Sequence, residues 1–119
     1  MSVISLWTKV PEYGDKICIC SSLKDALCLW SNIGIPSIAV QGEGYNISDT
    51  AINNLKSRYK KIYVSFDTDT PGILNTKRLA QKTGFIPIIP DLKDCKDYSD
   101  YYKSLLDKNK FQKLKELFI

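Results

Sequence analysis

The sequence contains no histidine, which removes the side chain that most often acts as a general base near neutral pH. Any chemistry must come from carboxylates, lysines, hydroxyls or thiols. Cysteine is scarce too, with four residues, Cys18, Cys20, Cys28 and Cys95. The first two form a C-x-C within an apolar run, whereas structural zinc sites favour C-x-x-C pairs or histidines. We therefore expect reduced thiols packed in a core.

Long apolar runs are also missing. No segment approaches the roughly 20 apolar residues of a membrane-spanning helix. The N-terminal stretch "MSVISLWTKVPEYGDK" lacks the basic start, long apolar centre and cleavage site of a signal peptide. We expect a cytoplasmic protein with no membrane partner. A length of 119 residues, with 44% hydrophobic and 25% charged residues, indicates one folded domain. The net charge of +4 is mildly basic and only weakly favours an anionic partner.

Short apolar runs alternate with segments of helical period, which is the pattern of parallel βαβ units. Strands are expected at Lys16–Cys20, Pro36–Val40, Lys61–Phe66 and Phe85–Ile89. Helices are expected at about Ser22–Asn32, from Ser48 or Asp49 with Tyr59 in the apolar stripe, and from Pro71 to about Lys82. The predicted fold is an α/β, Rossmann-like, four-stranded and mainly parallel sheet with helices on both faces.

The two ends of the chain depart from this alternation. An additional antiparallel strand is predicted around Val3–Trp7. The C-terminal residues 103–119 are predicted to end in an amphipathic helix with Phe111, Leu114 and Phe118 inward. Together with a core at about residues 16–102, they make a single domain spanning residues 1–119.

The stretch "YVSFDTDTPG" holds two aspartates, Asp67 and Asp69, directly after the third predicted strand. Residues i and i+2 of an extended segment point the same way, so both carboxylates can converge on one Mg²⁺. Gly72, after Pro71, allows a tight turn into a helix whose N-terminal amides can hold a phosphate. The alternative is structural, with Asp69 or Thr70 as a helix N-cap and Asp67 paired with a lysine. Taken alone, the motif leaves both interpretations open.

Three segments together resemble one family. "FDTDTPG" resembles the DxD motif of the TOPRIM domain of bacterial and phage primases, a domain also found in topoisomerases and some small nucleases. "ICICSSLKDALCLWSNIGIPSIAVQGEG" is similar to the first TOPRIM motif, in which Glu-Gly-x-x-Asp-Ala-Leu follows a strand. "KDYSD", at Lys96–Asp100, is similar to the Lys-Asp-Pro-x-Asp element of primases. The resemblance covers about residues 16–102 and implies a TOPRIM fold with Mg²⁺ or Mn²⁺ as cofactor.

The chain departs from the family at its catalytic glutamate. Ser21 and Ser22 occupy the Glu-Gly positions, whereas Asp25 of the same motif is retained. In the family this glutamate acts as a general acid or base, or as a metal ligand, and serine lacks both the charge and a suitable pKa. We hypothesise that Glu43, in "QGEGYN" after the second strand, supplies the missing carboxylate beside Asp67 and Asp69. The alternative is a solvated loop glutamate.

Other charged and aromatic residues have two interpretations each. Lys24, Lys96 and Asp97 could contact phosphate or a second cation, but they also suit a solvated surface. Asp25 could orient the site or favour the helix N-terminus electrostatically. A lysine-rich C-terminal segment is interpreted as a solvated helix face rather than a nucleic-acid track, and a tyrosine group as either base-stacking or core. These two sets are Lys108, Lys110, Lys113 and Lys115, and Tyr98, Tyr101 and Tyr102.

The resemblance predicts Mg²⁺-dependent nucleotidyl transfer, as in RNA primer synthesis on single-stranded DNA during replication. The chain has no zinc-binding module and no P-loop, so we expect an excised domain or a small phage-encoded protein that works with a helicase or another primase domain. Its ligands would be single-stranded DNA and nucleotides. Two alternatives stay open: a Mg²⁺-dependent nuclease, and a domain that only binds nucleic acid or a partner because the glutamate is absent.

Overall fold

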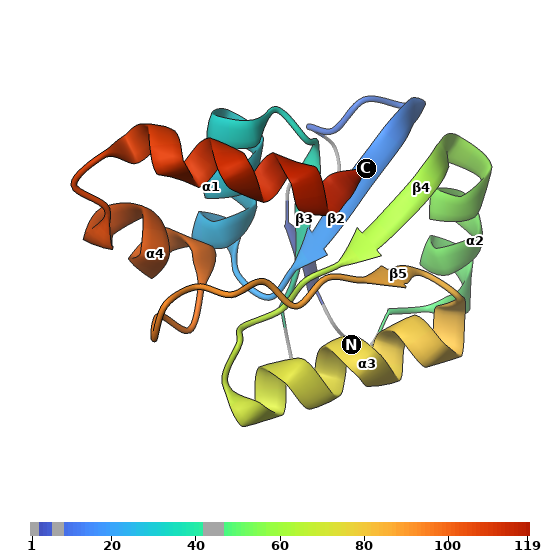
Figure 1. The fold of residues 1–119 in the computed structure, drawn as a ribbon. Coiled ribbons are helices and arrows are strands. Elements are labelled where there is room, and N and C mark those ends of the chain that lie inside the picture. The colour runs from blue at the N-terminus through green and yellow to red at the C-terminus, as the bar shows by residue number, and fades with distance from the viewer. Residues whose placement is uncertain (1–2, 6–8, 42–46) are drawn as a thin grey trace.

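The computed structural model describes residues 3–5, 9–41 and 47–119. Five strands form one sheet in the order β1-β3-β2-β4-β5 (Figure 1). β1 pairs antiparallel with β3, and the remaining neighbours are parallel. The strands are β1 (Val3–Ser5), β2 (Gly14–Cys20), β3 (Ser37–Gln41), β4 (Tyr59–Val64) and β5 (Ile86–Pro87). The predicted α/β fold and its four parallel strands are confirmed, and so is the antiparallel N-terminal strand over Val3–Ser5, whereas residues 6 and 7 of that prediction lie outside the described residues.

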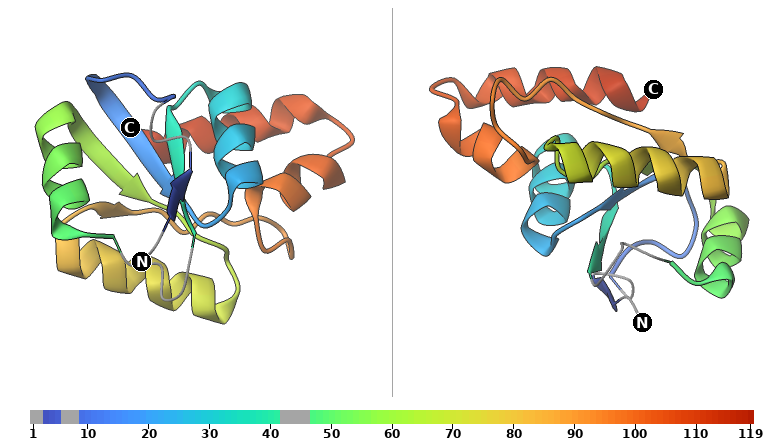
Figure 2. Two further views of the ribbon diagram at one scale, coloured as in Figure 1. Left: turned by 180° about the vertical axis from the view of Figure 1, so that it is seen from behind. Right: turned by 90° about the horizontal axis from the view of Figure 1, so that it is seen from below.

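Helices cover both faces of the sheet (Figure 2). They are α1 (Leu23–Ile33), α2 (Asp49–Arg58), α3 (Thr70–Thr83), α4 (Tyr98–Ser104) and the 3₁₀ helix η2 (Lys108–Phe118). Ile17, Ile19 and Val64 pack against α2 and α3 in one apolar cluster. Cys18 and Cys20, on the alternate positions of β2, pack with α1, α4 and η2 in the other. Successive side chains of β2 thus point alternately into the two apolar clusters, as expected for a strand covered on both sides.

A capping serine and two glycines mark the ends of helices α1 and α3. Ser22 caps α1, and its side chain accepts a hydrogen bond from the Asp25 amide. Gly34 and Gly84 end α1 and α3 in the left-handed conformation, with φ of 85° and 81°. Glycine suits these two positions because it has no Cβ to strain the backbone there. Ser22 thus marks where α1 starts after β2, and the two glycines mark where α1 and α3 end.

Three boundaries differ from expectation. Tyr59 begins β4 rather than completing the stripe of α2, and its hydroxyl donates to the Pro11 carbonyl. β4 ends at Val64, two residues before the predicted Phe66. The last strand has only two residues, and Pro87 is tolerated there because β5 is an edge strand in which the Ile88 amide, not that of residue 87, bonds to the Val64 carbonyl. The C-terminal helix is 3₁₀, yet Phe111, Leu114 and Phe118 are buried as predicted. The spacing of three between Phe111 and Leu114 aligns their side chains in that helix.

Two expectations from composition can be compared with the structure. All four cysteines are free of disulfides, and Cys18 and Cys20 are fully buried. Within the described part of the chain, no helix combines the length and apolarity that crossing a membrane requires.

Candidate functional site

The carboxyl ends of β2 and β4 bring Ser21 and Asp67 together. Ser21 follows β2 directly, and Asp67 lies three residues beyond the end of β4, which runs parallel to β2. The Ser21 hydroxyl donates to Asp67 Oδ1 at 2.9 Å. Ser21, which the resemblance places where the family has its glutamate, therefore contacts Asp67, the first aspartate of the predicted motif. It supplies a neutral donor there in place of a negative charge.

Asp25 lies below this pair in the first turn of α1 and is almost completely buried, with 2% of its surface exposed. Its Oδ2 accepts a hydrogen bond from the Ser22 hydroxyl at 2.9 Å, and its Oδ1 accepts one from the Ser99 amide at 3.1 Å. The second bond links α1 to α4, which are far apart in the sequence. Asp25 therefore joins the first turns of α1 and α4 at this edge of the sheet.

Asp97 completes the group from the start of α4. It is the N-cap of that helix, accepting a hydrogen bond from the Asp100 amide at 2.8 Å, and 4% of its surface is exposed. Lys24 Nζ lies 3.7 Å from Asp97 Oδ2, and the charge of Asp97 is the main cause that raises the pKa of Lys24. The Lys24 side chain remains largely exposed, so it lies on the solvent side of the site.

Asp25, Asp67 and Asp97 form what we call the acidic cluster, in which one carboxylate oxygen from each lies within 4.8 Å of the others. Burial raises the pKa of Asp67, and the charges of Asp25, Asp97 and Asp69 raise it further, against the hydrogen bond from Ser21 that lowers it. Burial is also the main cause that raises the pKa of Asp25. The ionised cluster is thus unfavourable without a compensating cation.

The acidic cluster fits a hard divalent cation. Mg²⁺ takes oxygen ligands at about 2.1 Å in octahedral geometry, so two of its ligands lie about 3 to 4.2 Å apart, within the 4.8 Å limit found for these carboxylate oxygens. The hydrogen bonds to these carboxylates leave lone pairs for a further ligand. Three carboxylates with no thiol or imidazole favour Mg²⁺ or Mn²⁺ over zinc. The cluster could therefore hold a metal ion.

The raised carboxyl pKa values predict how the metal-free protein responds to pH. A carboxyl whose folded-state pKa lies above the unfolded value costs stability while it is ionised, and this cost is relieved as the pH falls through the folded-state pKa. In EDTA, Asp67→Asn should therefore have a higher melting temperature than the wild type at pH 7. The difference between the two melting temperatures should become smaller toward pH 4. Thermal unfolding at several pH values measures it.

The exposed Asp94→Asn variant is the matched control for that experiment, because it removes the same charge outside the acidic cluster. Its melting temperature relative to the wild type should not follow the same trend. A constant gap between Asp67→Asn and the wild type across this pH range would contradict the prediction.

Asp69, the second aspartate of the motif, is exposed and caps α3, where its Oδ1 accepts a hydrogen bond from the Gly72 amide at 2.9 Å. It does not belong to the acidic cluster, although its charge acts on Asp67. The Gly72 amide is thereby engaged within the chain. Lys96 is exposed, and its carbonyl accepts the Thr68 amide at 2.6 Å. Glu43 lies outside the described residues.

From the sequence, Asp25 was expected only to orient the site or stabilise a helix start, and Asp97 only to contact phosphate or a second cation. The structure shows that they supply two of the three clustered carboxylates. The available signal was their position, since each opens a helix that follows a strand or loop at the same edge. Of the three tyrosines, Tyr98 is a core residue with 2% exposure, whereas Tyr101 and Tyr102 are half-buried and pack around Phe111.

Comparisons with known proteins agree with this arrangement. A search of curated proteins finds no match to the chain. Among solved structures, it matches a chain in the complex of bacteriophage T7 lagging-strand DNA polymerase interacting with primase domains of two gp4 subunits bound to an RNA/DNA hybrid and dTTP. The TM-score is 0.59 at 16% identity, and the match covers 91% of this chain but 55% of that one.

The family comparison covers the segments that carry the acidic cluster. Residues 18–102 match the family model described as Toprim-like. This span includes Ser21, Asp25, Asp67 and Asp97, and it agrees with the predicted range of about 16–102. The chain therefore belongs to the Toprim-like family.

Proposed function

We propose that this protein is a primase-type TOPRIM domain, which binds Mg²⁺ or Mn²⁺ and takes part in nucleotidyl transfer during RNA primer synthesis on single-stranded DNA. The observation that carries the proposal is the acidic cluster at the carboxyl edge of the parallel sheet, where α/β proteins place their ligands. Family membership and the T7 structural match support the primase type.

Asp67, Asp25 and Asp97 would hold the cation, with Asp69 and Glu43 as further candidate ligands from the flanking segments. A bound cation would neutralise substrate phosphates and stabilise charge on the transferred phosphoryl group. Ser22 and the Ser99 amide orient Asp25, while Ser21 orients Asp67. These donors hold the carboxylates in place before any ligand arrives, which limits the reorganisation that binding requires.

Lys24 is the basic residue best placed to contact a substrate phosphate. Its Nζ lies beside Asp97 and is raised in pKa by that carboxylate, so it stays protonated. Side-chain exposure of 58% leaves it accessible from solvent. Lys96, at the start of the segment that carries Asp97, is a second candidate. Together they would contact phosphates at the rim of the acidic cluster.

The share of the matched chain that this protein covers bears on which partners it needs. The chain spans 55% of the length of the solved chain that it matches, so complete primer synthesis would need other domains or proteins. We propose a helicase or another primase domain as the partner, and single-stranded DNA and nucleotides as ligands in the cytoplasm.

One specific observation favours a second candidate function, in which the domain binds nucleic acid or nucleotide without catalysing transfer. Ser21 occupies the position of the family's glutamate and donates a hydrogen bond to Asp67. Serine cannot replace a carboxylate as general acid or base at neutral pH. Under this alternative the cation and the phosphates still bind at the acidic cluster, but turnover is absent.

The test compares the wild type with Ser21→Glu and its uncharged counterpart Ser21→Gln. Each is assayed with Mg²⁺ for primer synthesis from ribonucleotides on single-stranded DNA, for nicking of DNA, and for binding. Primer synthesis by the wild type supports the main proposal, nicking would indicate a nuclease, and binding alone would support the second candidate. In that last case Ser21→Glu should show turnover about a hundredfold or more above the background of the assay, the usual contribution of a general acid or base, and Ser21→Gln should not.

A further inference from the structure

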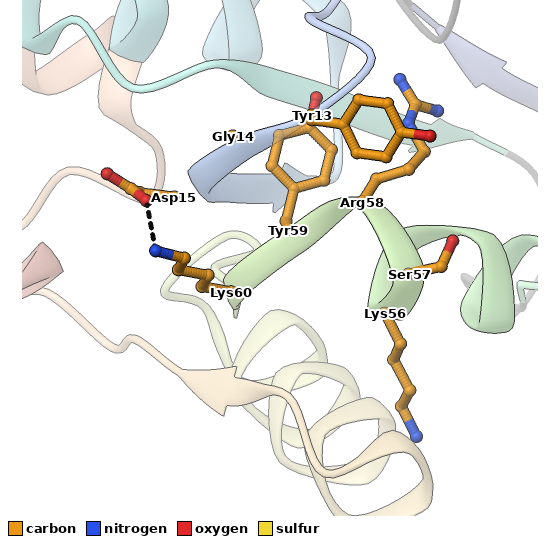
Figure 3. A pocket seen from close by; sticks show the side chains of 8 residues that line it. All are labelled: Tyr13, Gly14, Asp15, Lys56, Ser57, Arg58, Tyr59 and Lys60. Carbon is orange, nitrogen blue, oxygen red and sulfur yellow. Dashed lines mark ion pairs between the residues drawn. The ribbon is translucent and has the colours of Figure 1, made fainter.

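The opposite edge of the sheet carries a second charged feature, which the acidic cluster does not explain. A hollow of about 600 Å³ lies where β2 and β4 begin (Figure 3). A smaller one of about 230 Å³ shares Lys56, Tyr59 and Lys60 with it. We call the two together the basic groove. Because β2 and β4 are parallel, this groove and the acidic cluster lie at opposite ends of the same strands.

Charge in the basic groove is strongly one-sided. Its lining contains Lys56, Arg58, Lys60 and Lys61, against a single acidic residue, Asp15. Lys60 Nζ lies 3.5 Å from Asp15 Oδ1, but both side chains are more than four-fifths exposed, so this pair is weak. Figure 3 shows the pair at one side of the hollow and the Lys56 side chain extending away from the end of α2.

The sheet register adds a like-charge pair near the start of the same two strands, although Lys16 lines neither hollow. Lys16 of β2 is the direct neighbour of Lys61 of β4. Like charges on directly paired positions of neighbouring strands destabilise a sheet. An anion bound between the two strands would relieve this repulsion. The register therefore supplies an observation independent of the groove's shape.

An exposed aromatic ring accompanies these lysines. Tyr13 lines the groove and is 69% exposed, the only aromatic among the well-exposed large hydrophobic side chains of the described residues. Arg58 holds the segment that precedes Tyr13, because its guanidinium donates to the carbonyls of Pro11 at 2.8 Å and Glu12 at 2.6 Å. The ring is thus presented from a fixed segment beside basic side chains.

Part of this arrangement has a structural explanation. Lys56 and Arg58 lie in the last turn of α2, where positive charge is favourable next to the helix C-terminus. That explanation does not extend to Lys60, Lys61 and Lys16, which lie on strands, or to the exposure of Tyr13.

We propose that the basic groove binds single-stranded nucleic acid, with the lysines contacting phosphates and Tyr13 stacking on a base. Proteins that bind single strands combine a positively charged groove with exposed aromatic rings in this way. An acidic peptide would use the lysines but would gain little from Tyr13. This binding requires neither the metal nor the acidic cluster, so it goes beyond the proposed function and can be tested apart from it.

The experiment measures fluorescence anisotropy of a labelled oligothymidylate of about 12 nucleotides, within the usual site size, in buffer with EDTA. Lys60→Gln with Lys61→Gln should weaken binding about tenfold and reduce the salt dependence by about 1.4 in slope, or 0.7 for each phosphate contact. The matched control, Lys110→Gln with Lys113→Gln, removes the same charge from exposed positions of η2 and should have a much smaller effect.

Three single variants separate the contributions. Tyr13→Ala should weaken binding about tenfold through lost stacking, while Tyr13→Phe retains it. Asp15→Asn should tighten binding about two- to fivefold, because it removes the acidic competitor of Lys60. Asp67→Asn should bind as the wild type does, even if the proposed function fails.

Four results would overturn the proposal. The first is no binding by the wild type, and the second is an equal loss in the η2 control pair. The third is loss of binding in Asp67→Asn, which would place the nucleic acid at the acidic cluster. The fourth is an unaffected Tyr13→Ala variant together with competition by polyglutamate, which would identify the groove as a surface for an acidic protein.

Discussion

Replacing Asp67 with asparagine is expected to weaken Mn²⁺ binding by about a hundredfold or more, since affinity for hard cations depends strongly on the number of charged ligands. Asp67 supplies one of only three carboxylates in the acidic cluster. The same change should leave the metal-free protein at least as stable as the wild type at neutral pH, because it removes a carboxyl group whose pKa is raised by burial. Calorimetric titration with Mn²⁺ and thermal unfolding in EDTA give the two readouts.

Asp69→Asn makes this experiment sharper. Asparagine caps helices as well as aspartate does, so its side chain can still accept the hydrogen bond from the Gly72 amide. A loss of Mn²⁺ affinity in this variant would therefore report on Asp69 as a ligand and not on damage to α3. Asp94→Asn, on an exposed loop with a φ of 71° that asparagine tolerates, is the control for charge alone. Equal affinities in the wild type and Asp67→Asn would contradict the proposed metal site.

Gly72→Ala is expected to destabilise the protein by about 3 kcal/mol or more, as severe overpacking does. A Cβ at position 72 would lie 2.0 Å from the Asp67 carbonyl oxygen and 2.9 Å from Asp69 Oδ1. Backbone must move to admit it, and the segment that moves carries Asp67. At about 3–5 °C for each kcal/mol in a domain of this size, the melting temperature should fall by about 10 °C or more, with a parallel loss of Mn²⁺ affinity.

The matched control is Gly84→Ala. That glycine has a φ of 81° and no atom within 4 Å of the added Cβ, so the cost is limited to the left-handed conformation, about 1–2 kcal/mol. Mn²⁺ affinity should be unchanged because Gly84 lies at the far end of α3. If Gly72→Ala were no more harmful than Gly84→Ala, the close approach of α3 to Asp67 would be refuted.

Strands and helix starts were predictable from the sequence because their signals are local. The apolar run of β2, the cap at Ser22 and the glycines after α1 and α3 each act over a few residues. Tyr59 was misplaced for the same reason, since its spacing fits the stripe of α2, while its backbone pairs with Gly14 in the ladder of β2 and β4 and its hydroxyl contacts the distant Pro11 carbonyl. Local pattern cannot register a partner 48 residues away.

The acidic cluster illustrates the same limit. Asp67 was found because it follows a strand, whereas the position of Asp97 depends on where the long connection from β5 returns across the sheet. Asp25 looked like an ordinary first-turn aspartate, and only its contact with the Ser99 amide reveals that it is buried between α1 and α4. Which carboxylates meet is thus decided by tertiary packing.

The hydrogen bond from the Ser99 amide to Asp25 makes one backbone proton a built-in reporter. That amide is buried and donates to a carboxylate of the acidic cluster, so its exchange with deuterated solvent requires α1 and α4 to separate locally. A cation that draws on the same carboxylate would alter both the exchange rate and the chemical shift of this proton. The state of the site can then be followed without a label, a substrate or any catalytic turnover.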